Sequence, residues 1–189
     1  MTKPLIIYVT GTPGSGKTTL AREISLKLHI PHLNSDLITS GVSLSIGGQE
    51  DRARELTKTV IPILQFFAQK NVSCVFDQLL QKSPEPEAVL DELSLFAKII
   101  FIHTLAQDPI SRYLNRELSR TDRSVSRKNL TEEKIRERAT HHRENLAQTE
   151  LPADYENPVL VVKTDGEYSP GLDEICDFIE KNYKNKEAK

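Results

Sequence analysis

The sequence predicts an α/β fold in which helices cover both faces of a sheet of five parallel strands. Three observations support this prediction. Five short apolar runs alternate with longer segments that have the spacing of amphipathic helices. Apart from residues 31–34 the runs are mainly apolar, as in parallel strands that are buried on both faces. The first run leads through a glycine-rich loop directly into a helix. The length of the chain predicts one domain over residues 1–189.

The expected elements alternate along the chain. β-Branched and aromatic side chains predict strands over residues 5–9, 72–76, 99–103 and 159–162, and we expect a short second strand over residues 31–34. Apolar residues at helical spacing predict helices over residues 18–29, 50–67, 84–95 and 171–183, and a charged helix opens at residue 131. We also expect a kink or a helix restart at Pro62, a loop of small side chains over residues 41–48, and a frayed tail from residue 184.

The loop after the first predicted strand has the pattern of a phosphate-binding loop, GTPGSGKT over residues 11–18. Its glycines let successive backbone N–H groups point inward, and the following helix directs the positive end of its dipole to the same place. Lys17 can reach the β- and γ-phosphates of a nucleotide, and the Thr18 hydroxyl can ligate magnesium. We therefore expect nucleotide binding by Gly11, Thr12, Pro13, Gly14, Ser15, Gly16, Lys17, Thr18 and Thr19.

Two aspartates follow predicted strands, at the edge of a parallel sheet where ligands bind. Asp77 ends the third strand, where a carboxylate can hold magnesium together with Thr18; an aspartate there can also be a turn former. Asp36 follows the second strand and can accept the proton of a hydroxyl that attacks the γ-phosphate. The alternative for Asp36 is the N-cap of a helix that starts at Leu37.

A run of arginines predicts a mobile lid over about residues 112–130. Arg112, Arg116 and Arg120 recur every four residues on one helical face, and a polar segment follows them. Arginines of a lid stabilise the charge of a transferring phosphoryl group and exclude water. We therefore expect a catalytic role for Arg116 and Arg120, and nucleotide contact by Arg116. The alternative is a solvated helix face on which Glu117 pairs with the arginines.

Composition limits the partners and the location of the protein. The chain is 38% hydrophobic and 28% charged with a net charge of −2, which gives no general attraction to nucleic acid or to a membrane surface. Its two cysteines, Cys74 and Cys176, lie in patterns typical of core residues in a reducing compartment. We therefore expect a cytoplasmic protein, a monomer or a homodimer, that does not bind membranes.

Together these residues resemble the P-loop kinases of the nucleoside monophosphate kinase-like group, over nearly the full length of the chain. Within that group the chain is similar to AAA-type predicted kinases, the kinase domain of phage-type polynucleotide kinase and chloramphenicol phosphotransferase. The resemblance implies a three-layer α/β/α P-loop NTPase fold and makes Asp36 the catalytic base. It implies that Thr164 and Asp165, after the last strand, hold adenine, and it matches Arg138 to the helix after the lid of adenylate kinases.

Two departures from nucleoside monophosphate kinases concern the acceptor. Thr39 stands where those enzymes place an arginine for the acceptor phosphate, and Gln78, Leu79 and Leu80 replace their arginine-bearing segment. We therefore expect transfer of the γ-phosphate of ATP, with Mg²⁺ as cofactor, to a hydroxyl group of a small molecule or a nucleoside. A polynucleotide is a less favoured acceptor because the net charge is −2. The alternatives are a nucleoside monophosphate kinase and a P-loop switch that hydrolyses its nucleotide.

Overall fold

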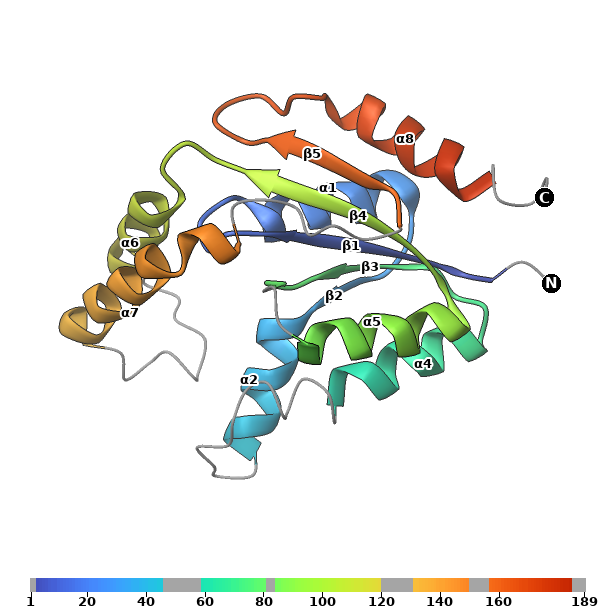
Figure 1. Cartoon of the computed structure of the whole chain (residues 1–189), viewed down its shortest axis with the longest axis horizontal. Coiled ribbons are helices and arrows are strands. Elements are labelled where there is room, and N and C mark those ends of the chain that lie inside the picture. Colours follow the sequence, from blue (N-terminus) through green and yellow to red (C-terminus); the bar gives the residue numbers. More distant parts are fainter. Residues whose placement is uncertain (1–2, 46–58, 81–83, 120–130, 150–156, 185–189) are drawn as a thin grey trace.

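The strands form one sheet in the structure, a computed structural model that describes residues 3–45, 59–80, 84–119, 131–149 and 157–184. The strands lie in the order β2-β3-β1-β4-β5, and each neighbouring pair is parallel (Figure 1). They are β1 (Leu5–Gly11), β2 (His32–Asn34), β3 (Cys74–Asp77), β4 (Lys98–Leu105) and β5 (Val159–Lys163). The predicted parallel sheet is confirmed, and its central strand, β1, leads into the phosphate loop.

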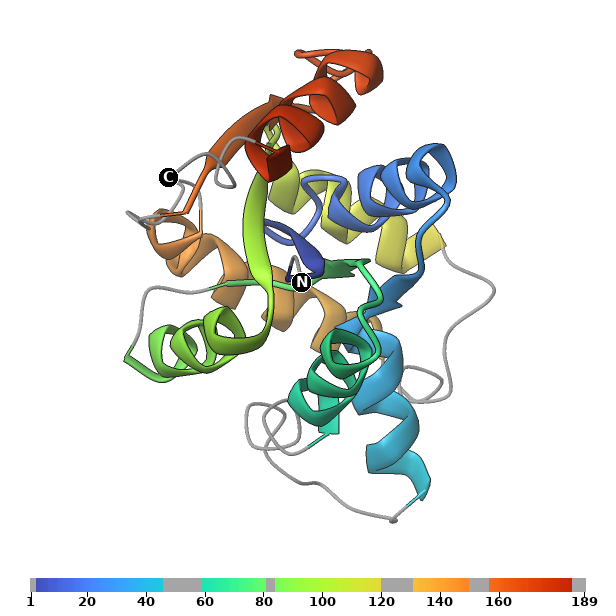
Figure 2. The same cartoon turned by 90° about the vertical axis from the view of Figure 1, so that its right-hand side faces the viewer.

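Helices cover both faces of this sheet, which confirms the predicted three-layer architecture. In Figures 1 and 2, α1 and α8 lie on one face, α4 and α5 lie on the other, and α6 and α7 extend beyond the carboxyl ends of the strands. The helices are α1 (Lys17–Leu28), α2 (Ser35–Ser45), α4 (Ile61–Gln69), α5 (Pro84–Phe96), α6 (Pro109–Ser119), α7 (Glu132–Glu144), the 3₁₀ helix η3 (Leu146–Gln148) and α8 (Leu172–Lys184). No described helix has both the length and the apolar composition that crossing a membrane requires.

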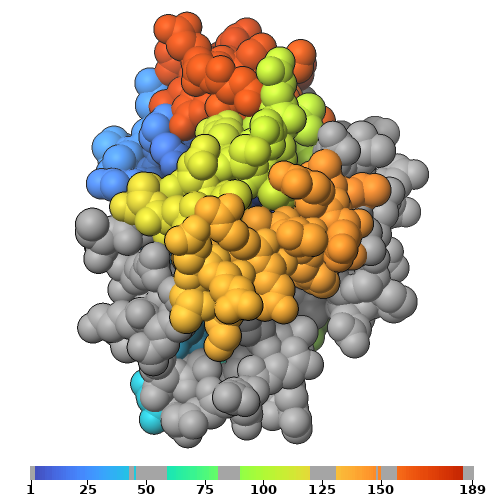
Figure 3. All heavy atoms as spheres, turned by 90° about the vertical axis from the view of Figure 1, so that its left-hand side faces the viewer, coloured from blue at the N-terminus to red at the C-terminus, as the bar shows by residue number. Residues whose placement is uncertain are grey.

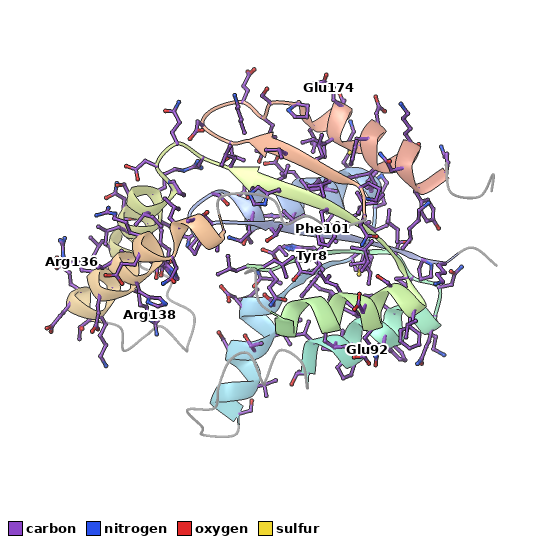
Figure 4. The ribbon with its side chains drawn as sticks, in the orientation of Figure 1. Tyr8, Glu92, Phe101, Arg136, Arg138 and Glu174 are labelled. Carbon is purple, nitrogen blue, oxygen red and sulfur yellow. The ribbon has the colours of Figure 1, made fainter. Side chains whose placement is uncertain are left out.

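The core has two halves because successive side chains of β1 point to opposite faces of the sheet. On one face Ile7 packs with Leu20 and Ile24 of α1 in a buried cluster. On the other face the ring of Tyr8 lies 5.3 Å from that of Phe101, among side chains of α4 and α5. Figure 4 shows both rings in the interior, at the level of the sheet. The strand that carries the phosphate loop is therefore anchored from both sides.

A third, smaller cluster joins α6 to α7. Ile110 and Tyr113 of α6 are buried with Ala139 of α7, and Leu114 and Leu146 pack against them. Figure 3 shows the two helices side by side across the end of the molecule where the strands finish. This packing holds α7 over the carboxyl edge of the sheet, although most of its side chains are polar.

Helix α2 (Ser35–Ser45) was not among the predicted helices, and a helix at this place entered only as the alternative for Asp36. Residues 41–45, expected in a loop of small side chains, continue this helix to Ser45, so the prediction is wrong for them. Hydroxyl side chains favour loops when they compete for the backbone, but here they bond within the helix. Thr39 donates to the carbonyl of Ser35 at 2.8 Å, and Ser45 donates to the carbonyl of Gly41 at 2.9 Å.

Pro62 lies in the first turn of α4, which begins at Ile61. A proline is accommodated there because its missing N–H has no partner within the helix. The helix expected over residues 50–58, the lid from Arg120 to residue 130 and the tail over residues 185–189 lie outside the described residues.

The burial of α1 predicts a contrast between two of its leucines. Leu20 is fully buried, whereas Leu26 is 64% exposed. We expect Leu20→Ala to lower the free energy of unfolding by about 2–5 kcal/mol, because it removes buried methyl groups and leaves a cavity. Leu26→Ala, the matched control, should change it by less than about 0.5 kcal/mol. Urea unfolding followed by circular dichroism measures both, and equal losses would contradict this placement of α1.

Candidate functional site

A cleft of about 390 Å³ opens at the carboxyl edge of the sheet, between the phosphate loop, the ends of β2 and β3, and the helices α2, α6 and α7. Its lining includes the predicted site residues Pro13, Gly14, Gly16, Lys17, Thr18, Thr19, Asp36, Asp77 and Arg116. Among the described predicted residues, those that do not line it are Gly11, Thr12, Ser15, Thr164 and Asp165. The fold thus brings together a phosphate loop, two carboxylates and a lid arginine.

Two glycines determine the shape of the phosphate loop. Gly14 and Gly16 have φ angles of 90° and 88°, in the left-handed region that other residues rarely adopt. Gly14 also lies so close to α6 that a Cβ atom would be 1.8 Å from the carbonyl oxygen of Pro109. Helix α1 begins directly after the loop at Lys17. Its first N–H groups therefore lie at the cleft and can bind an anion.

Buried hydroxyl groups fix the side of the loop that lies away from the cleft. Ser15 Oγ is 2.6 Å from Thr104 Oγ1, and Thr12 Oγ1 is 3.0 Å from Thr149 Oγ1. Thr164 Oγ1 donates to the carbonyl of Ser15 at 2.7 Å. Thr12 and Ser15 thus use their side chains inside the protein, and their contact with a nucleotide stays a prediction.

Thr164 and Asp165, predicted to hold adenine, connect the phosphate loop to α6. Arg112 Nη1 donates to the carbonyl oxygen and to Oγ1 of Thr164, at 3.1 and 3.3 Å. The Asp165 carboxylate accepts from the backbone N–H of Gln107 at 3.0 and 3.1 Å, and it lies 3.7 Å from Arg112 Nη1. Arg112 therefore ties α6 to this loop. The contact of Thr164 and Asp165 with adenine stays a prediction.

Lys17 lines the cleft, and its Nζ donates to the carbonyl oxygen of Thr12 at 3.0 Å. Burial lowers the pKa of Lys17 to about 8. The carboxylates of Asp36 and Asp77 oppose this shift, and the Arg116 guanidinium adds to it. At pH 7 the ammonium is therefore charged but poorly solvated, a state that a bound phosphate would stabilise.

The buried carboxylate of Asp77 accepts hydrogen bonds on both of its oxygens. Thr18 Oγ1 donates to Oδ2 at 2.6 Å, and Asn34 Nδ2 lies 2.9 Å from each oxygen. His32 Nε2 lies 2.9 Å from Oδ1. These contacts hold Asp77 beside Thr18. The two side chains must be this close together if both are to bind one magnesium ion.

His32 and Asn34 are site residues that the sequence interpretation missed. Residues two apart on a strand lie on the same face, and β2 lies beside β3 with Asn34 opposite Asp77. The alternation of the two polar residues before Asp36 was a usable signal. It pointed to Asp77 only once the order of the strands was known.

Asp36 is exposed and lines the cleft from the first turn of α2. The N-cap role considered for it belongs to Asn34, whose Oδ1 accepts a hydrogen bond from the backbone N–H of Leu37 at 2.8 Å. The structure thus places the Asp36 carboxylate on the same cleft as Lys17, and its role as a catalytic base stays a prediction.

Arg116 lines the cleft from α6, beside two neighbours on the same helix. Its Nη2 lies 3.1 Å from Glu117 Oε1, and its guanidinium carbon lies 5.7 Å from the centre of the Tyr113 ring. Glu117 is buried, whereas the side chain of Arg116 is 47% exposed. The pairing with Glu117 that the sequence left open is therefore present, and it leaves Arg116 at the cleft.

Three residues of α7 complete the cleft and were not predicted as site residues: Arg138, His141 and His142. In Figure 4 Arg138 lies on the side of α7 nearer to α2, whereas Arg136 lies on the outer side. Arg136 pairs with Glu132 at 2.6 Å. A helix with so many charged residues is expected to be exposed to solvent, so its residues were not predicted to line a site. The resemblance to adenylate kinases was the one sequence signal for Arg138.

Comparisons with known proteins agree with this architecture. Residues 10–136, from the phosphate loop into α7, match the model of the AAA domain family AAA_17. The chain belongs to this AAA domain family. The matched segment contains Lys17, Asp36, Asp77 and Arg116 and ends before Arg138. No curated protein sequence matches the chain.

Several solved structures share the fold. A protein from Chloroflexus aurantiacus, described as a kinase, has a TM-score of 0.72 and 18% identity, over 95% of this chain and 98% of that one. A gluconokinase from Sinorhizobium meliloti has a TM-score of 0.56 and 17% identity, over 98% and 94% of the two chains. A shikimate kinase from Bacteroides thetaiotaomicron has a TM-score of 0.55 and 15% identity, over 94% and 97%. These likenesses establish the P-loop α/β fold.

The lowered pKa of Lys17 predicts how stability depends on pH. Below the pKa of about 8 that Lys17 has in the folded protein, Lys17 is charged in both the folded and the unfolded chain. Its poorly solvated charge in the folded protein then lowers the free energy of unfolding. Between about 8 and the unfolded value of 10.5 only the unfolded chain keeps the proton, so stability rises with pH. We expect Lys17→Met to be more stable than the wild type at pH 7 and to lose part of this advantage by pH 10. Urea unfolding measures the difference, and a pH-independent difference would contradict the shift.

Proposed function

We propose that this protein is an ATP-dependent phosphotransferase that moves the γ-phosphate of magnesium-bound ATP to a hydroxyl group of a small molecule or a nucleoside. The position of Asp36 carries this proposal. Its exposed carboxylate shares the cleft with Lys17 of the phosphate loop, and the cap of α2 is supplied by Asn34 instead. A carboxylate beside a phosphate-binding loop repels an anionic acceptor but suits a hydroxyl, whose proton it can accept.

Residues on different walls of the cleft perform different parts of the transfer. The loop N–H groups, the N-terminus of α1 and Lys17 hold the β- and γ-phosphates. Asp36 orients the acceptor hydroxyl and takes its proton while the hydroxyl oxygen attacks the γ-phosphorus. The new oxygen–phosphorus bond forms as the bond from that phosphorus to the β,γ-bridging oxygen breaks, and ADP leaves. Arg116, once it exchanges Glu117 for phosphate oxygens, offsets the charge of the group in transfer.

Thr18 and Asp77 are the residues that would hold the magnesium ion accompanying ATP. Their side-chain oxygens lie 2.6 Å apart, and hydroxyl and carboxylate oxygens are ligands that Mg²⁺ takes. When bound, the ion neutralises charge on the β- and γ-phosphates. The donors from His32 and Asn34 fix the direction in which the Asp77 carboxylate points.

The start of α2 favours a hydroxyl over a phosphate as the acceptor group. Thr39, where nucleoside monophosphate kinases place an arginine, is buried, and its hydroxyl donates to the carbonyl of Ser35 at 2.8 Å. The described residues of this wall, 34–45 and 77–80, include no lysine or arginine. Within these described segments an acceptor phosphate would therefore find no cation.

The proposed base predicts the effect of Asp36→Asn. We expect kcat for transfer to fall by about 10²–10⁴-fold, because the amide cannot accept the proton, while the Kd for ATP changes by less than about twofold. Asp173→Asn is the control, since Asp173 is an exposed residue of α8 that pairs with Lys27 at 2.7 Å. It should leave both constants unchanged.

The assay follows label from [γ-³²P]ATP onto nucleosides, 5′-hydroxyl oligonucleotides, sugars, and aminoglycoside or phenicol antibiotics. Label on one hydroxyl acceptor that is lost with Asp36→Asn supports the proposal. Label on the phosphate of a nucleoside monophosphate would instead indicate a nucleoside monophosphate kinase. Equal release of phosphate to water with every compound would indicate a hydrolysing switch.

The contacts of Asp77 predict a role for His32 in the magnesium requirement. We expect His32→Leu to raise the magnesium concentration for half-maximal activity by about tenfold, because the Asp77 carboxylate loses one of the donors that orient it. His29→Asn is the control, since His29 ends α1 with a φ of 53° that asparagine tolerates. Activity is measured as a function of free Mg²⁺, and the same dependence in both variants would contradict the role of His32.

A further inference from the structure

The imidazole of His142, on α7, lines the cleft together with Lys17 and Asp36. Its ring packs edge-on against that of Tyr113 on α6, with ring centroids 5.1 Å apart and an interplanar angle of 87°. Tyr113 is itself buried in the cluster that joins α6 to α7. Packing therefore holds His142 in a defined position, as ligand recognition requires.

The surroundings of His142 disfavour the charged form of its ring. The groups that act on it come from three helices: Lys17 of α1, Asp36 of α2, and Arg138 and His141 of α7. Burial, followed by the charges of His141, Lys17 and Arg138, lowers the pKa of His142 to about 4, and Asp36 opposes this shift. Bound phosphates would raise this pKa, and the burial of the ring opposes that rise.

A neutral imidazole has one N–H donor and one nitrogen acceptor, which is the hydrogen-bonding capacity that matches a hydroxyl group. In the proposed transfer Arg116 and Arg138, which line the cleft, would offset the charge of the triphosphate that Lys17 alone does not. A neutral His142 offers no positive charge that would attract an anionic acceptor, and the carboxylate of Asp36 repels an anionic acceptor. The part of the acceptor that meets His142 is therefore polar and uncharged.

We propose that His142 selects the acceptor: its imidazole hydrogen-bonds a second hydroxyl of an uncharged, polyhydroxylated molecule whose first hydroxyl lies at Asp36. Sugars, polyols and the ribose of a nucleoside belong to this class. The inference rests on the proposed function, because it needs Asp36 to face the reacting hydroxyl. His142 is then a specificity-determining residue, and Asp36 and the phosphate loop perform the transfer.

The test compares neutral probes with anionic counterparts: D-ribose with ribose 5-phosphate, D-glucose with D-gluconate, and adenosine with AMP. With the wild type we expect transfer to a hydroxyl of at least one neutral probe, with kcat/KM about tenfold or more above that of its anionic counterpart. His142→Phe keeps the packing on Tyr113 but loses both hydrogen-bonding nitrogens. It should raise the acceptor KM by about 10–100-fold and change the KM for ATP by less than about twofold.

Two further variants separate recognition from a structural effect. His142→Gln restores a donor and an acceptor and should recover part of the acceptor affinity. Arg136→Gln, on the outer side of the same helix, should change neither KM (Figure 4).

Different failures have different meanings. An unchanged acceptor KM in His142→Phe, or an equal rise in the KM for ATP, would overturn the role of His142 and leave the proposed function standing. Transfer to a hydroxyl of the anionic probes in preference to the neutral ones would do the same. Transfer to no hydroxyl at all would contradict both proposals.

Discussion

The close approach of Gly14 to α6 is the constraint on which the rest of the cleft depends. A Cβ atom at Gly14 would lie 1.8 Å from the carbonyl oxygen of Pro109, so the phosphate loop lies directly against the N-terminus of α6. That contact places Arg116 at the cleft, and the packing of Tyr113 against α7 then places His142 there as well. The contact at Gly14 thus helps to position two walls of the cleft relative to the phosphate loop, together with the hydrogen bonds from Arg112 to Thr164.

The other wall depends on strand order. Because β3 lies beside β1 and β2 lies beside β3, the ends of these strands bring Asp77 and Asp36 to the phosphate loop. The two carboxylates are treated differently. Asp77 is buried and surrounded by donors, which suits a fixed partner of a cation, whereas Asp36 is exposed to whatever enters the cleft. The buried charge of Lys17 opposes folding, and bound phosphate would relieve that cost.

Features with a local signal could be predicted from the sequence, and features that depend on packing could not. The strands could be predicted from apolar runs, and the phosphate loop from glycines such as Gly14. Both signals lie within a few consecutive residues. Residues 41–45 were mispredicted because small and hydroxyl side chains are common in loops. The hydrogen bond from Ser45 to the carbonyl of Gly41, within α2, is not visible in the sequence. Asn34 and His142 were missed because their roles need the neighbouring strand and helix, which are distant in sequence.

A crystal structure with Mg²⁺ and a non-hydrolysable ATP analogue tests the account most directly. We expect the γ-phosphate beside Lys17 Nζ, the metal within about 2.1 Å of Thr18 Oγ1, and Asp36 across from the γ-phosphorus with room for one hydroxyl oxygen between them. A triphosphate turned away from Asp36, or a nucleotide base that fills the space at α2, would contradict the assignment of this cleft to phosphate transfer onto a hydroxyl.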